Sequence, residues 1–64
     1  MEEFDIWRTA HQLIKEHGSD ARSQAAYFAS KMLEHRNYEG YAVWGLVWMA
    51  IKVMQEQALA EPSN

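Results

Sequence analysis

The most apolar segment of the chain reads YAVWGLVWMAIKVM, residues 41–54, and Lys52 is its only charged residue. If the segment is helical, one stripe of its surface holds Trp44, Val47, Trp48, Ile51 and Gln55. Their i, i+3, i+4, i+7 spacing is typical of a helix face turned toward a core. The segment is shorter than the roughly 20 apolar residues that span a bilayer. We therefore predict a helix covered by protein.

A second apolar stripe lies on the opposite side of the same predicted helix. It consists of Leu46, Met49 and Val53. A small isolated bundle normally places charged residues on its outer side. An apolar patch there indicates a contact surface, so we predict that these three residues form an interface.

The chain as a whole is short and offers few other means of stabilisation. It has 64 residues, of which 48% are hydrophobic and 23% charged, and it has no cysteine. This composition is that of one folded domain rather than a disordered chain. A domain of this size buries only about 60% of its unfolded surface, and disulfides are not available to support it. Dense helix packing and self-association are the remaining routes, because no metal site is expected.

The charge pattern disfavours several classes of function. The net charge of −3 is small and scattered, which disfavours nucleic-acid binding. The opening MEEFDIW lacks the basic start and apolar core of a signal peptide. A helix lying on a membrane surface usually carries a basic face, which is not found here. We expect a cytoplasmic protein that does not contact membranes.

The hydrophobic periodicity predicts an all-α fold with helices over about 3–17, 20–35 and 40–57. These helices form a single domain, residues 1–58, and residues 59–64 form a flexible tail. The first helix is expected to turn one face inward, made of Phe4, Trp7, Ala10, His11 and Ile14, with Ile6, Leu13 and His17 at its edge. The apolar face expected for the second helix is rich in alanine, and small side chains let a neighbouring helix approach closely. Short loops between the helices predict that consecutive helices are antiparallel neighbours.

Helix ends and glycines give further expectations. Glu2, Glu3 and Asp5 place negative charge at the start of the first helix, and Gly18 suits its end. Ser19 or Asp20 is expected to cap the second helix. The Asn37–Gly40 segment is expected to break the chain between the second and third helices, since Asn37 tolerates the left-handed conformation and Gly40 loosens the start of the next helix. Gly45, inside the third helix, costs about 1 kcal/mol relative to alanine, which suggests a close contact there, with mere tolerance of glycine as the alternative.

The segment DARSQAAYFASKMLEHRNYEGYAVWGLVWMAI, residues 20–51, carries a resemblance to a known family. With the opening IWRTAH and the His17-Gly18 pair, it resembles a family of short uncharacterised helical proteins from proteobacteria, a domain of unknown function. The resemblance implies no activity, cofactor or site residue. In that family the third helix looks more polar than residues 45–49 here, which adds weight to a partner surface. The two helices and their turn also look like one tetratricopeptide repeat, but one repeat cannot stand alone.

Candidate catalytic and metal-binding residues have simpler structural roles. His11 is expected at the edge of the core, and whether it does more than pack stays open. His11 and His17 do not have the i, i+4 spacing of a metal-binding pair, and His35 is on another helix, so no metal or other cofactor is expected. The carboxylates at helix starts are explained by capping. We therefore predict a protein that is not an enzyme.

Aromatic and basic residues give two weaker interpretations. Trp48 and Lys52, four residues apart, are candidates for a cation–π contact. Arg36, Tyr38 and Tyr41 form a candidate stacking platform for single-stranded nucleic acid, although tyrosines that close the ends of the bundle explain the pattern better.

The complete prediction is an all-α, small three-helix bundle in which the third helix is central, completed by homodimerisation through Leu46, Met49 and Val53. For function we predict a non-enzymatic protein–protein interaction module, an adaptor, regulator or inhibitor. A phage-encoded inhibitor of the anti-CRISPR type is one speculative subclass. The alternative is a nucleic-acid-binding module that uses Arg36, Tyr38 and Tyr41.

Overall fold

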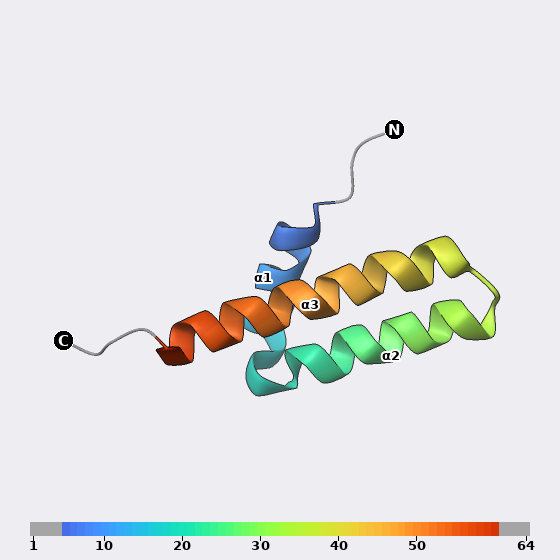
Figure 1. Cartoon of the computed structure of the whole chain (residues 1–64). Coiled ribbons are helices and arrows are strands. Elements are labelled where there is room, and N and C mark those ends of the chain that lie inside the picture. Colours follow the sequence, from blue (N-terminus) through green and yellow to red (C-terminus); the bar gives the residue numbers. More distant parts are fainter. Residues whose placement is uncertain (1–4, 61–64) are drawn as a thin grey trace.

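The chain folds into three α-helices (Figure 1). The structure is a computed structural model and describes residues 5–60. Its elements are α1 (Ile6–His17), the short 3₁₀ turn η1 (Gly18–Asp20), α2 (Ala21–Glu34) and α3 (Tyr38–Ala60). No strand occurs within residues 5–60. The predicted all-α class is therefore confirmed, and Glu2, Glu3 and Phe4 lie outside the described residues.

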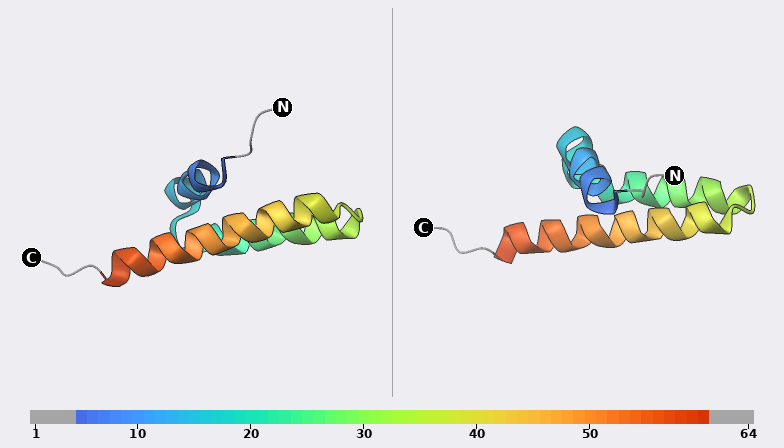
Figure 2. Two further views of the ribbon diagram at one scale, coloured as in Figure 1. Left: turned by 45° about the horizontal axis from the view of Figure 1, so that its top comes forward. Right: turned by 90° about the horizontal axis from the view of Figure 1, so that it is seen from above.

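Helix α3 is the central element. Helices α2 and α3 lie side by side as an antiparallel hairpin, and both α1 and α2 pack on α3 (Figure 1). Helix α1 does not extend the antiparallel arrangement. Seen from above, it crosses the hairpin at a steep angle (Figure 2). Helices α1 and α2 are in contact, as expected for neighbours, but the expectation that they run antiparallel is wrong, because η1 redirects the chain between them.

The buried core is small and rich in alanine. It consists of Ala10, Leu13, Ala21, Ala25, Val47, Ala50 and Ile51, with Ile6, Ile14, Trp44, Trp48 and Met54 packed against it. Among the residues whose burial the structure describes, only Val47 and Ile51 are large side chains with no exposed surface. Alanine removes little apolar area from water, and a buried valine or isoleucine contributes about 1.5–3 kcal/mol. Alanine therefore lets the helices pack closely, but the resulting core contributes only modestly to the stability of the fold.

The surface that α1 turns inward differs from the predicted one. Ala10 and Leu13 are buried, whereas Trp7 is 55% exposed and His11 is exposed. Helix α1 is therefore rotated so that its Ile6–Ala10–Leu13 stripe faces α3. A helix that crosses its neighbour makes a short contact, and small Ala10 permits the crossing. The prediction that His11 lies at the core edge is wrong.

The helix ends match the predictions in part. Asp5 precedes α1, and its Oδ1 accepts a hydrogen bond of 3.0 Å from the backbone N–H of Arg8. Gly18 follows α1 with φ 56°, and its N–H donates to the Ile14 carbonyl oxygen. Asp20 makes no side-chain cap, because η1 leads directly into α2. The predicted Asp20 cap is therefore wrong.

The turn between α2 and α3 uses different residues from those expected. Arg36, not Asn37, has the positive φ, at 59°. Asn37 instead caps α3, since its Oδ1 accepts a hydrogen bond of 2.8 Å from the Gly40 N–H. Helix α3 therefore begins at Tyr38, before the predicted start at 40. It continues to Ala60, so the predicted tail is wrong for residues 59 and 60, and residues 61–64 lie outside the described part.

Two glycines of α3 have opposite surroundings. A Cβ on Gly40 would lie 2.6 Å from the Met32 sulfur, so the α2–α3 hairpin closes tightly there. A Cβ on Gly45 would meet nothing within 4 Å. The close contact predicted at Gly45 is therefore wrong, and Gly45 faces open space.

Candidate docking surface

Helix α3 is apolar on two opposite sides, and only one of them is covered. Val47 and Ile51 face α1 and α2 with no exposed surface, while Leu46 is 56%, Met49 52% and Val53 39% exposed. Ala42, one turn before Leu46, is also exposed. We call Ala42, Leu46, Met49 and Val53 the outer face of α3. The three residues predicted as an interface thus lie together at the surface.

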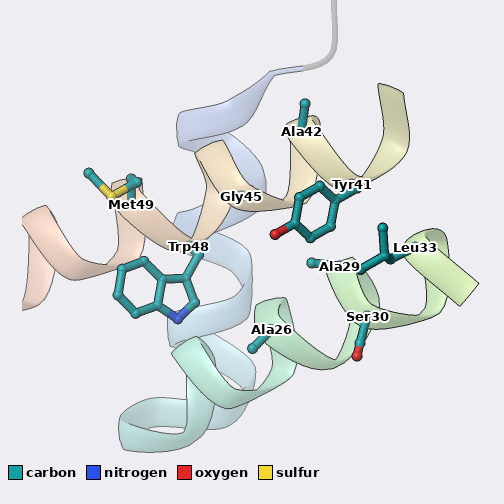
Figure 3. Close-up of a pocket in the computed structure, with 9 residues that line it drawn as sticks. All are labelled: Ala26, Ala29, Ser30, Leu33, Tyr41, Ala42, Gly45, Trp48 and Met49. Atoms are coloured by element: carbon teal, nitrogen blue, oxygen red, sulfur yellow. The ribbon is translucent and has the colours of Figure 1, made fainter. Parts of the chain in front are cut away.

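A first groove lies between α2 and α3, beside the outer face. It encloses about 530 Å³ and is lined by Ala26, Ala29, Ser30, Leu33, Tyr41, Ala42, Gly45, Trp48 and Met49. Figure 3 shows Tyr41 and Trp48 projecting from α3 on either side of Gly45. Because Gly45 has no side chain, the space between the two rings stays open. We call this the α2–α3 groove, and its few polar side-chain groups are the Ser30 and Tyr41 hydroxyls and the Trp48 indole N–H.

A second groove lies on the other side of the outer face, between α1 and α3. It encloses about 300 Å³ and is lined by Ile6, Trp7, Leu46, Met49, Ala50 and Val53. We call it the α1–α3 groove. Met49 lines both grooves, so the outer face is a ridge between two apolar hollows. Most of the large exposed hydrophobic residues belong to this surface: Trp7, Leu33, Tyr41, Leu46, Met49 and Val53.

The charged groups near this surface are paired. Lys52 Nζ donates a hydrogen bond of 2.7 Å to Glu56 Oε2. This hydrogen bond, together with the charge of Lys52, lowers the pKa of the Glu56 carboxyl. Lys52 was expected to contact Trp48, but the cation over the Trp48 ring is Arg22, at 5.8 Å from its centroid. Arg22 comes from α2, so this contact joins two helices.

The histidines do not converge on a metal site. His11, His17 and His35 are exposed, and His17 Nε2 lies 4.0 Å from Glu16 Oε1. Within the described residues no three metal-ligating side chains form a group.

The candidate nucleic-acid platform is distributed over the turn and the groove. Arg36 lies in the α2–α3 turn and Tyr38 is exposed at the start of α3. Tyr41 instead lines the α2–α3 groove. Elsewhere in the described residues, three cations are paired with acids: Arg8 with Asp5, Lys31 with Glu34 and Lys52 with Glu56. Such pairing leaves little positive field to attract phosphate.

No match to this chain was found. The comparisons covered protein families, curated proteins and solved structures. The resemblance to short proteobacterial helical proteins therefore stays a prediction. Among the described helices, none combines the length and the apolar character needed to cross a membrane.

Sequence reasoning missed Trp7, Leu33 and Tyr41 as parts of the surface. Trp7 was placed in the core because it shares a face with Ala10 and Ile14. The competing stripe of Ile6, Ala10 and Leu13 has the spacing i, i+4, i+7, which is also that of a core face. That second stripe was the signal available in the sequence.

Proposed function

We propose that this protein is a non-enzymatic interaction module that docks the outer face of α3 on another protein. The observation that carries the proposal is the exposure of Leu46, Met49 and Val53 between two apolar grooves. Contiguous apolar surface of this kind on a small protein marks an interaction site. Its role would be that of an adaptor, regulator or inhibitor.

The residue types on this surface support the proposal. Binding energy at protein interfaces is concentrated in a few residues, and Trp, Tyr and Met are enriched there. Trp7, Tyr41 and Met49 line the two grooves and are each about half exposed. A partner that covers them removes apolar area from water at about 25 cal/mol per Å².

The pattern of α3 gives a second support. A helix that is apolar around its whole circumference is normally buried on all sides. Helices α1 and α2 cover only the side of Val47 and Ile51. The opposite side is therefore exposed to solvent, although its apolar residues favour burial.

Site-specific photo-cross-linking in living cells tests the proposal. A benzophenone side chain replaces Leu46 in one variant and Glu34, an exposed residue of α2 outside both grooves, in the control. We expect adducts with protein at position 46, few at position 34, and loss of the former when Met49→Lys is added. Equal labelling at both positions, or none at either, would contradict a docking role for this face.

The nucleic-acid alternative has weaker support, because the cations Lys31 and Lys52 are paired with acids. It predicts binding of single-stranded DNA or RNA that weakens steeply with salt and requires Arg36 and Tyr38. Fluorescence anisotropy at low salt measures this directly, and no binding there would end the alternative.

A further inference from the structure

We propose that the occupant of the outer face of α3 is a second copy of this chain, packed antiparallel across a two-fold axis that passes between Leu46 and Met49. The inference rests on the proposed function and names the partner. It requires that the surface be complementary to itself, because a two-fold axis brings the same patch of both chains together.

The order of residues along the outer face is nearly the same in both directions. From the midpoint between Leu46 and Met49, one direction passes Leu46, Ala42 and Glu39, and the other passes Met49, Val53 and Glu56. Each direction therefore meets a large apolar residue, a second apolar residue and a glutamate. A two-fold axis at the midpoint sets apolar residues against apolar residues along the contact and glutamates against glutamates at its two ends.

The spacing of the outer face also suits packing against a helix. Ala42, Leu46, Met49 and Val53 are separated by four, three and four residues, the a/d spacing of helices that pack along their length. In the antiparallel arrangement small Ala42 lies opposite larger Val53 of the second copy, and Leu46 lies opposite Met49. A parallel arrangement would set Ala42 against Ala42 and leave a gap, which a packed interface disfavours.

The charges at the two ends favour the same arrangement. The two-fold axis brings Glu39 toward Glu56 of the second copy, where Lys52 already holds that carboxylate at 2.7 Å. The Lys52 ammonium can then serve both carboxylates, which weakens the repulsion between them. In a parallel dimer the two Glu39 carboxylates would approach each other without a neighbouring lysine.

The available area is close to that of a stable dimer. The large exposed side chains of the surface are each about half exposed, and at about 200 Å² for a complete large side chain they offer roughly 600 Å². These side chains are Trp7, Leu33, Tyr41, Leu46, Met49 and Val53. A standard interface buries about 800 Å² per partner. Ala42 and the charged ends add to the area, so a second copy is a sufficient occupant.

Disulfide trapping tests both the partner and its orientation, because the natural chain has no cysteine. Full-length Ala42→Cys and Val53→Cys variants are oxidised separately and as an equal mixture, and the products are separated by intact mass. In the antiparallel dimer residue 42 faces residue 53, while two copies of residue 53 are about 16 Å apart along the helix. A disulfide needs Cβ atoms about 3.5–4.5 Å apart.

We expect the mixed 42–53 disulfide to dominate in the mixture and each single variant to stay largely reduced. Ser23→Cys, at an exposed position of α2 outside both grooves, gives the level of random collision. Disulfides of Val53→Cys with itself above that level would overturn the antiparallel arrangement. No disulfide above that level in any sample would overturn the second copy as the occupant.

The photo-cross-linking experiment separates this inference from the proposed function. An adduct at position 46 with twice the chain mass of 7.5 kDa supports a second copy. Adducts only with other proteins, together with no disulfide, would overturn the dimer and leave the docking function standing. No adduct of any mass would remove both.

Discussion

The two sides of α3 have similar composition and opposite surroundings. The inner side buries Val47 and Ile51 completely, and the outer face leaves Leu46, Met49 and Val53 about half exposed. Both sides have apolar residues at helical spacing, so periodicity alone does not indicate which side is buried. What distinguishes them is the small side chains of α1 and α2, such as Ala10 and Ala25, which let those helices close over the inner side. The inner side therefore stabilises the fold, and the outer face is free to bind.

The largest expected effect comes from truncating each side of α3 in turn. Ile51→Ala removes a fully buried side chain and should lower the free energy of unfolding by about 2–5 kcal/mol. Leu46→Ala changes an exposed residue and should alter the stability of the monomer by only about 0.5 kcal/mol. Chemical denaturation at high dilution measures both. Equal losses for the two variants would mean that the two sides of α3 are not distinct.

The next largest effect on stability is expected from alanine substitutions at two glycines of α3. Gly45→Ala places a methyl group in open space inside a helix and should stabilise the fold by about 1 kcal/mol. Gly40→Ala should lack this gain, because its Cβ would lie 2.6 Å from the Met32 sulfur and 3.0 Å from the Asn37 amide nitrogen. Thermal melts monitored by circular dichroism show which of the two variants is more stable. If Gly40→Ala were the more stable variant, the tight closure of the hairpin at Met32 would be wrong.

The residues that precede α1 and α2 allow a further comparison, in which the expected effect on stability is of similar size. Asp5→Ala removes the acceptor of the Arg8 N–H and should destabilise the protein by about 1 kcal/mol. Asp20→Ala should cost less, since Asp20 makes no capping hydrogen bond and contributes only its charge at the start of α2. Urea titrations of the two variants measure the difference. A larger loss for Asp20→Ala would show that η1 depends on that carboxylate.

The smallest effect concerns the Lys52–Glu56 pair at the end of the outer face. The hydrogen bond from Lys52 lowers the pKa of Glu56, so the folded state favours the ionised carboxylate. A carboxyl with a depressed pKa contributes stability above its unfolded pKa, about 4.3. That contribution is lost as the pH falls through the folded pKa. Glu56→Gln should therefore melt at a slightly lower temperature than the natural chain at neutral pH, and at the same temperature at low pH. Thermal melts between pH 2 and pH 7 measure this difference.

The fold class and the central position of α3 could be predicted from sequence because they depend on periodicity over many residues. The exposure of Leu46, Met49 and Val53 was predictable for the same reason, since α3 has more apolar surface than two short helices can cover. These features do not depend on the position of any single atom.

The rotation of α1 could not be predicted from periodicity. Trp7 and Ala10 both fit an apolar stripe, and the steep crossing over α3 selected the smaller residue for the contact. The environment of Gly45 could not be predicted from the sequence either, because an open groove and a close contact both permit glycine. The residue with the positive φ could not be predicted either, since Asn37 tolerates the left-handed conformation but its side chain caps α3, and Arg36 has the positive φ.

Molar mass in solution across a dilution series, with helicity followed in the same samples, tests the central claim most directly. The account predicts a species of twice 7.5 kDa that dissociates on dilution, and a Leu46→Lys variant that is monomeric at every concentration. Tyr27→Lys, a change of an equally exposed residue outside the two grooves, should leave the dimer intact. A natural chain that stays at 7.5 kDa and fully helical at every concentration would contradict the second copy as the partner of this face.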